Sequence, residues 1–239
     1  MEIQTRIFLY LSVLSLLPMG QALAQQKDIH DMEIKPEIQV QVRDIAHFES
    51  DILTAQKKGL QYLPQTMQTK NILGWRFLDR NSQSVGKIVD VLLDIRTGDF
   101  RKIKVAPDRL NFVGPLYFDM KAQNIEIEDS VIRCDMDKRQ IQDSQLDLGK
   151  APEDMTEMVS LKSLSGSLVY DRDGVLAATV RGAFGMEKDH KITYLDTVLA
   201  QTRQGIAIPL NQIKIVQQNG LLGIHLTDEQ LAVMKRLAK

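Results

Sequence analysis

From residue 72 onward, hydrophobic and polar residues alternate in short runs with the period of two that is typical of β-strands. Turn-forming residues separate the runs, most clearly at 81–84 and at 96–99, where Gly98 can adopt a positive φ. The pattern therefore predicts short antiparallel strands joined by tight hairpins. The runs lie at residues 75–77, 85–93, 100–105, 125–127 and 132–136.

One face of these strands is expected to form a hydrophobic core, because alternate side chains of a strand point to the same side of the sheet. The residues expected to point inward are Val89, Val91 or Leu92, Ile103, Val105, Ile132 and Cys134.

The segment before the first run has a different pattern. Residues 25–70 are polar and lack alternation, but Ile45, Phe48 and Ile52, with Leu53, recur at helical spacing. This spacing predicts one short amphipathic helix, and we expect the rest of 25–70 to be an extended tether.

A weak repeat divides the chain from residue 72 to the end. The pair Asp79-Arg80 corresponds to Asp171-Arg172, and after one deletion Val89 corresponds to Val180. Toward the end of each copy, residues 131–141 correspond to 221–231 at a constant offset of 90, which places Ile224 opposite Cys134. Such a repeat indicates that one supersecondary unit has been duplicated.

Each copy closes with a helix start of the capping-box type. Thr227 is followed three positions later by Gln230, and Asp137 is followed in the same way by Gln140. Short hairpins followed by a capped helix favour two tandem small antiparallel β-barrels, so the fold class is mainly β. A single sheet domain built from both copies is the structural alternative. The expected segments are a signal peptide at 1–24, the tether at 25–70, a first barrel at 71–148, a linker at 149–160 and a second barrel at 161–239.

The N-terminus has the pattern of a secretory signal. Arg6 precedes an apolar run at 7–17, which is too short to span a bilayer comfortably, and Ala22 and Ala24 form a small-x-small cleavage site. We expect cleavage after Ala24 and a mature protein in the periplasm or outside the cell, with no stable membrane span. An uncleaved anchor is the alternative.

Composition further limits how the protein can be stabilised and which partners it can have. The only cysteine is Cys134, so an exported chain would have no internal disulfide and would depend on its core. The formal net charge is −1 with acidic and basic residues mixed, which argues against a nucleic-acid partner. Trp75 is the only tryptophan, and no stacking platform for bases or sugars is visible.

Three carboxylates beside turns, Asp79, Asp90 and Asp94, are candidates for acid–base chemistry. Such chemistry would need two of them in one cleft with separated pKa values, whereas Asp beside a tight turn ordinarily binds turn amides. We expect the structural role and therefore no catalytic residue.

The remaining candidates for chemistry are also weak. An acidic group around one predicted hairpin could hold Ca²⁺, but it lacks the glycine-punctuated EF-hand loop, and the histidines lack zinc spacing. Cys134 shares a face with Ile132 and Met136, so we expect a buried thiol, not a nucleophile. Gly182 and Gly185 lack the Lys and Ser or Thr of a phosphate loop. No metal or cofactor is expected at the residues concerned, which are Glu126, Glu128, Asp129, Asp135, Asp137, His30, His47, His190 and His225.

The first copy resembles a known family, the PRC-barrel domain. The resemblance rests on Gly74 and Asp79, the run Val-Gly-Lys-Ile-x-Asp-Val-Leu-Leu-Asp at 85–94, and the Thr-Gly pair at 97–98. It is good over 72–106 and fair to 141. The second copy keeps fewer of these residues, but its Ile-Ala-Ile-Pro-Leu at 206–210 resembles the family strand that ends in Pro-Leu.

The resemblance implies a six-stranded antiparallel barrel that serves mainly as an assembly or binding module, with no common catalytic set. We therefore expect a non-catalytic exported binding or scaffold protein with protein partners in the cell envelope or a small ligand. A structural subunit of an envelope assembly, including a homo-oligomer, is the first alternative. A hydrolase or metal-dependent enzyme with its site between the two copies is the second.

Overall fold

The computed structural model describes residues 44–63, 66–108, 114–128, 130–153, 157–218 and 221–238. The expected signal peptide and the tether up to residue 43 lie outside these ranges, as do His30 and Asp129. No helix within these ranges is long and apolar enough to cross a membrane.

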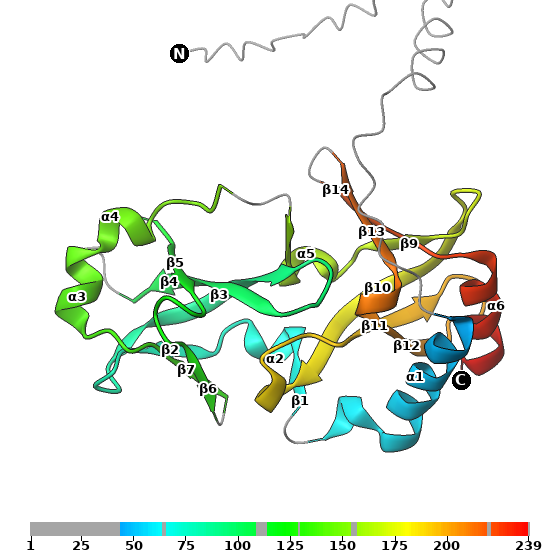
Figure 1. Cartoon of the computed structure of the whole chain (residues 1–239), viewed down its shortest axis with the longest axis horizontal. Coiled ribbons are helices and arrows are strands. Elements are labelled where there is room, and N and C mark those ends of the chain that lie inside the picture. The colour runs from blue at the N-terminus through cyan, green and yellow to red at the C-terminus, as the bar shows by residue number, and fades with distance from the viewer. Residues whose placement is uncertain are drawn as a thin grey trace, which may run out of the picture. The chain divides into compact units, whose positions relative to one another are not determined.

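The structure is mainly β and contains two seven-stranded sheets, one for each half of the repeat (Figure 1). The first half contains α1 (Ile45–Lys58), η1 (Leu60–Tyr62), β1 (Thr66–Gln68), α2 (Thr69–Ile72), β2 (Arg76–Leu78), β3 (Ser84–Asp94), β4 (Phe100–Pro107), β5 (Leu116–Asp119), β6 (Glu126–Glu128), β7 (Val131–Arg133), α3 (Lys138–Asp143) and α4 (Gln145–Leu148). The second half contains β8 (Met158–Ser160), α5 (Leu161–Leu164), β9 (Leu168–Tyr170), β10 (Leu176–Met186), η3 (Glu187–Asp189), β11 (Tyr194–Leu199), β12 (Gly205–Pro209), η4 (Leu210–Gln212), β13 (Lys214–Gln218), β14 (Leu221–His225) and α6 (Asp228–Leu237).

The two sheets have the same strand order. The first runs β5-β4-β3-β2-β7-β6 and the second β12-β11-β10-β9-β14-β13. Most neighbours are antiparallel, but β2 pairs with β7 and β9 with β14 in the parallel direction, which the hairpin pattern did not predict.

No described pairing joins β5 to β6 or β12 to β13, so the structure shows two sheets where closed barrels were expected. In the first sheet, a turn connects the two outer strands, with a hydrogen bond from the Ile125 N–H to the Met120 carbonyl. Strand β6 has three residues and pairs with β7, and no strand pairs with its other edge among the described residues.

Each sheet takes its seventh strand from the opposite half of the chain. Strand β1, which precedes the first copy, pairs with β10 of the second sheet, and β8, which precedes the second copy, pairs with β3 of the first sheet. Residues 66–70 were expected in the tether and 158–160 in the linker. Their short length hid the strands, because three residues are too few to show alternation.

The two halves correspond at an offset of 92 residues from β1 through β4 and again in β7, whereas the offset is 90 between β5 and β12 and 88 between β6 and β13. Phe77 pairs with Ile132, and Val169 pairs with Ile224 at the same positions of the second sheet. The expected deletion before Val180 does not exist, and the counterpart of Val89 is Arg181. Two residues are instead missing just before the last helix of the second half.

This shift corrects the alignment around the cysteine. The N–H of Cys134 donates to the Leu78 carbonyl, and the N–H of Leu226 donates to the Tyr170 carbonyl. The counterpart of Cys134 is therefore Leu226 and not Ile224. Within 131–141, the offset of 90 holds only for the helix starts, Asp137 and Thr227, whose predicted capping boxes are both formed.

A β-bulge in β3 explains the one expected inward residue that points outward. The register of β3 against β4 shifts between Ile88 and Asp90, so Val89 is the extra residue. Val89 is 37% exposed, whereas Ile88 is buried. The bulge changes the phase of the strand, which a strict period of two cannot anticipate. The other inward predictions are confirmed as buried: Val91, Leu92, Ile103, Val105, Ile132 and Cys134.

The core is continuous between the two halves. One cluster of buried residues includes Phe77 of the first sheet and Val169 of the second. The same cluster includes Phe48 and Ile52 of α1, the helix predicted within the tether. Helix α1 packs against β12 and α6 of the second half, while Leu53 on its other side is exposed.

Candidate functional site

Two adjoining hollows on the second sheet form one groove, with volumes of about 360 and 390 Å³. Residues from three parts of the chain line it: the end of α1 with η1, the β1–α2 segment, and strands β10 to β12. The two hollows share Gln61, Tyr62, Arg181, Phe184 and Asp196.

The rim of the groove is set by the end of α1. Gly59 adopts a left-handed conformation (φ 55°), and its N–H donates to the carbonyls of Ala55 and Gln56. Glycine is favoured here because it takes positive φ without steric cost. The turn leads into η1, where Tyr62 is 82% exposed.

The floor of the groove carries an ion pair. Arg181 is the extra residue of the bulge in β10, and its Nη2 lies 2.7 Å from Asp196 Oδ1 on β11. A Cβ atom on Gly205 of β12 would lie 3.0 Å from the guanidinium, so the glycine leaves room for the arginine.

The opposite wall comes from the exchanged segment. Gln68 Nε2 donates to the Gln61 carbonyl, and Lys70 lines the same hollow. The Thr69 hydroxyl accepts from the Ala183 N–H (2.9 Å) and donates to its carbonyl (3.2 Å), which fixes this segment to β10.

An apolar cluster lies behind the rim. The rings of Phe184 and Tyr194 stack with centroids 5.4 Å apart, and Ala55, Ala207 and Leu60 pack with them. The groove thus combines an exposed aromatic ring, two cationic side chains and side-chain amides. Such a surface can hold a partner's apolar side chain and its carboxylates, but it contains no nucleophile paired with a base.

The equivalent position of the first half is built differently. Asp90 replaces Gly182, and its carboxylate accepts from Ser160 Oγ (2.6 Å) and from the Lys162 N–H (3.1 Å). Val89 stands where Arg181 stands in the second half. The side chain of Asp90 therefore fastens β8 and α5 to the first sheet.

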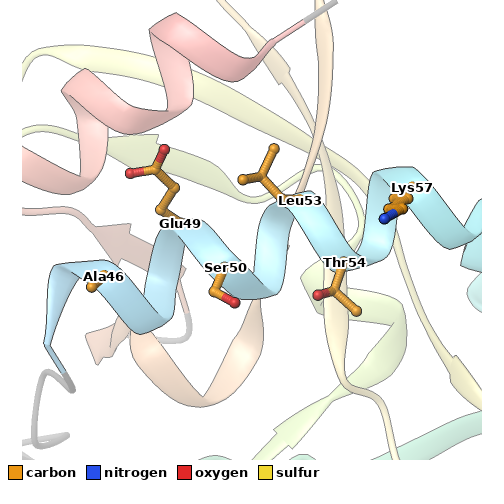
Figure 2. Close-up of a pocket in the computed structure, with 6 residues that line it drawn as sticks. All are labelled: Ala46, Glu49, Ser50, Leu53, Thr54 and Lys57. Atoms are coloured by element: carbon orange, nitrogen blue, oxygen red, sulfur yellow. The ribbon is translucent and has the colours of Figure 1, made fainter.

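A third hollow, of about 350 Å³, follows the outward face of α1 (Figure 2). Figure 2 shows Glu49 and Leu53 on one side of the helix and Ser50 and Thr54 on the other. Glu49 pairs with Arg236 of α6 at 2.6 Å. Because all lining residues belong to one helix, groups from separate elements do not converge there.

The three candidate carboxylates each serve their own part of the fold. Asp79 is buried, and its Oδ1 accepts from the N–H groups of Asn81 and Gln83. Its Oδ2 is buried without a hydrogen-bond partner among the described residues. Asp94 accepts from the N–H groups of Arg96 and Thr97.

Asp94 also pairs with Arg101 at 2.5 Å. Partial burial alone would raise the pKa of this carboxyl, but the hydrogen bonds from Arg101 and the turn amides outweigh it and hold the pKa below its usual value. The group is therefore ionised as a structural anion, the opposite of a general acid.

The cysteine is buried as predicted. Cys134 is 1% exposed, and burial raises its pKa to about 11. A thiol in this state is a poor nucleophile at neutral pH, because the thiolate is the reactive form.

The acidic hairpin does not form a metal site in the described part of the chain. Asp137 caps α3, Asp135 pairs with Arg80 at 3.7 Å, and Glu126 and Glu128 are exposed. No group of three or more His, Cys, Asp or Glu residues suited to a metal occurs in that part.

The described histidines are also separate. His47 is exposed on α1, and His190 adopts a left-handed conformation in a turn. His225 is half-buried, with its ring 5.7 Å from that of Tyr170. Burial lowers its pKa.

The two glycines of β10 have structural explanations. A Cβ atom on Gly185 would lie 1.9 Å from the Lys191 carbonyl oxygen, so only glycine permits this close approach. Gly182 lines the groove.

Sequence reasoning missed the residues of the groove. Tyr62, Lys70, Arg181 and Asp196 come from four different elements and form no motif. The sequence did contain a sign that the segments before β2 and β9 are equivalent. Lys70 and Gly74 recur as Lys162 and Gly166, at the offset of 92.

Comparison with known proteins supports the family assigned to the first half. Residues 64–141 match the PRC-barrel domain family. No curated protein matches the chain. The likeness of the second half to the first rests on the shared strand order and register.

Proposed function

Because residues 64–141 are a PRC-barrel domain, we propose that the chain is a non-catalytic exported binding or scaffold protein. Its partner is a protein of the cell envelope, and the contact surface is the groove on the second sheet. The groove carries this proposal, because three separate parts of the chain build it and it combines aromatic and charged groups.

Within the described residues, no reactive groups converge in one place, and this favours binding over catalysis. The described carboxylates at turns are engaged by turn amides, an arginine or the exchanged segment. An active site would need ionisable groups with perturbed pKa values that converge in one pocket. Among the described residues that line the groove, Arg181 and Asp196 form an ion pair and Lys70 adds a second cation.

The groove also has the residue types of a binding hot spot. Tyrosine and arginine carry much of the binding energy at protein interfaces, since both offer large contact area and directed hydrogen bonds. Tyr62 is 82% exposed on the rim, and Arg181 lies on the floor. Export is supported by the signal pattern before Ala24 and by the single cysteine.

The proposal is tested by a crosslinking pull-down from envelope extract with the mature chain that begins at Gln25. We compare the natural chain with Tyr62→Ser and Arg181→Val, the second of which copies the first half. The matched control is Leu146→Ser, because Leu146 is 85% exposed on α4 and does not line the groove.

The natural chain and the control should retain one specific partner, and each groove variant should retain at least about tenfold less, the loss expected for a hot-spot residue. Equal retention by both groove variants would refute the groove as the contact surface. Turnover of a substrate that Asp90→Asn abolishes would refute the non-catalytic assignment.

A structural role in an envelope assembly is the second candidate. The β9–β10 hairpin exposes three large apolar side chains, Leu168 (38%), Val175 (60%) and Leu176 (42%). Adjacent exposed apolar residues are typical of contact surfaces. Light scattering compares the particle mass of Val175→Ser with that of the natural chain. Only an assembly that forms through this hairpin would have a lower mass in the variant.

A further inference from the structure

The two halves meet each other as the subunits of a two-fold dimer do. The Phe100 N–H donates to the His190 carbonyl at 3.1 Å, and the Ile192 N–H donates to the Gly98 carbonyl at 2.9 Å. At the offset of 92, Gly98 corresponds to His190 and Phe100 to Ile192. The two hydrogen bonds are therefore equivalent, because each joins one residue to the counterpart of the other bond's partner in the opposite half. This reciprocity defines an isologous interface.

The strand exchange obeys the same relation. Gln68 of β1 pairs with Phe184 of β10, and Ser160 of β8 pairs with Leu92 of β3. Both pairs convert into each other when 92 is added to or subtracted from each number. The exchange is therefore reciprocal in register as well as in strand order.

Side chains fasten both exchanged segments. Thr69, on the β1 side, makes two hydrogen bonds with Ala183. On the β8 side, Asp90 of the accepting strand binds Ser160 and the Lys162 N–H. Each sheet is complete only when the exchanged strand of the other half, β1 or β8, is paired with it.

We propose that the chain is a fused strand-exchanged dimer, and that a second copy of this chain can enter the same exchange. In such a pair, the first half of one chain completes the second half of the other, and the reverse. Every contact between halves is kept, so the two forms differ only in the linker and in the entropy of association.

The linker decides which form is populated. The segment between α4 and β8 spans residues 149–157 and joins the two halves within one chain. A connection of this length gives an effective concentration in the millimolar range, so the closed monomer is favoured in dilute solution. Near-millimolar protein, or a linker too short to let the halves dock, favours the dimer.

The test places a disulfide across the exchange. Thr66 and Met186 face each other in register, and Thr66 Oγ1 lies 3.8 Å from Met186 Sδ. Directly opposed residues of antiparallel strands have Cα separations within the disulfide range. The full chain with Thr66→Cys and Met186→Cys is unfolded, refolded and oxidised at micromolar and at near-millimolar concentration.

We expect a covalent monomer on a non-reducing gel at micromolar concentration and a covalent dimer at near-millimolar concentration. Deletion of residues 150–156 should give the covalent dimer at both concentrations. The matched control, Thr179→Cys with Val198→Cys, joins β10 to β11 within the second half, so it should give a covalent monomer throughout.

The proposal would be overturned if the chain with the natural linker gave a covalent monomer at every concentration. The experiment with the full-length linker tests the proposal even if the shortened chain fails to fold. Far-UV circular dichroism reports whether the shortened chain folds. A dimer that forms equally in the Thr179 and Val198 control would also overturn it, since the link would then not arise from the exchange. The outcome is distinguishable from that of the pull-down, because the disulfide reports which halves pair and the pull-down reports what binds the groove.

Discussion

The two halves use the same bulge for different purposes. In the first half, Val89 is the extra residue and Asp90 follows it; in the second, Arg181 is the extra residue and Gly182 follows it. Asp90 fills the position next to the exchanged segment and binds that segment, whereas Gly182 lines an open groove. Under the proposed function, a duplicated backbone thus keeps one copy for assembly and frees the other for binding.

The comparison also shows which features the two copies had to keep. The bulge and the strand exchange are present in both halves, and one buried cluster contains residues of both. The side chain that fastens the exchanged segment differs, since Asp90 lies on the accepting strand and Thr69 lies on the segment itself.

The largest effect is expected where the halves are most alike. Ile132 and Ile224 are equivalent, and both are fully buried in the common cluster. We expect Ile132→Ala and Ile224→Ala each to lower the free energy of unfolding by about 2–5 kcal/mol. Urea denaturation, followed by fluorescence of Trp75 and by circular dichroism, measures the change.

The shape of that transition matters as much as its midpoint. With one continuous core, both variants should unfold in a single transition that the two probes report alike. Two separate transitions, with Ile132→Ala shifting one and Ile224→Ala shifting the other, would show that the halves are independent domains.

The second-largest effect on stability is expected at the hydrogen bonds that hold the exchanged segments. Thr69→Val removes both hydrogen bonds to Ala183 at a buried position, and Asp90→Asn weakens the bonds to Ser160 and the Lys162 N–H. Each change should lower the free energy of unfolding by about 1–3 kcal/mol. Hydrogen exchange should reveal the site, with faster exchange in β1 for the first variant and in β8 for the second.

This pair tests the comparison directly, because each variant has the other as its control. Faster exchange in both β1 and β8 for either variant alone would mean that the two exchanges are not separately fastened. Unchanged exchange in both strands would show that the hydrogen bonds do not hold the segments.

The hydrophobic pattern predicted much of the architecture. The alternating runs identified the long hairpin strands, and the capping boxes at Asp137 and Thr227 located two helix starts. Burial of Val89 was predicted wrongly, because a bulge inserts one residue and reverses the phase beyond it. A deletion was assumed near Val180 for the same reason, although the two bulged strands align without any gap.

The exchange and the groove were beyond the reach of pattern reasoning. Strands of three residues, such as β1 and β8, are too short to carry a period. Their partners are distant in the chain, since Thr66 pairs with Met186 and Ser160 with Leu92. The groove depends on that exchange, since Gln68 and Lys70 reach it only through β1 pairing with β10. A site assembled in this way leaves no spaced motif in the chain.

A pH effect should distinguish the two halves, because Asp94 is equivalent to Met186, which cannot titrate. The Arg101 ion pair and turn amides depress the pKa of Asp94 in the folded state, after partial burial is overcome. Its stabilising contribution is therefore present above the unfolded pKa of about 3.9 and is lost as pH falls through the lower folded value.

Urea midpoints measured from pH 5 down to about 2 check this, since the unfolded pKa of about 3.9 lies within that range and the folded pKa lies below it. The natural chain should lose stability below pH 4 more steeply than Asp94→Asn. Met186→Leu, at the matched position, should keep the natural slope. Identical slopes for all three chains would contradict the assigned role of Asp94.

The smallest effect on stability is expected at the groove itself. Arg181 pairs with Asp196 across an exposed surface, and pairs of this kind contribute only about 0.2–1 kcal/mol. Arg181→Val, which copies the first half, should therefore change the urea midpoint little while it removes binding in the pull-down. A loss as large as that of Thr69→Val would show that Arg181 supports the fold, and the contrast between a fastened half and a binding half would then fail.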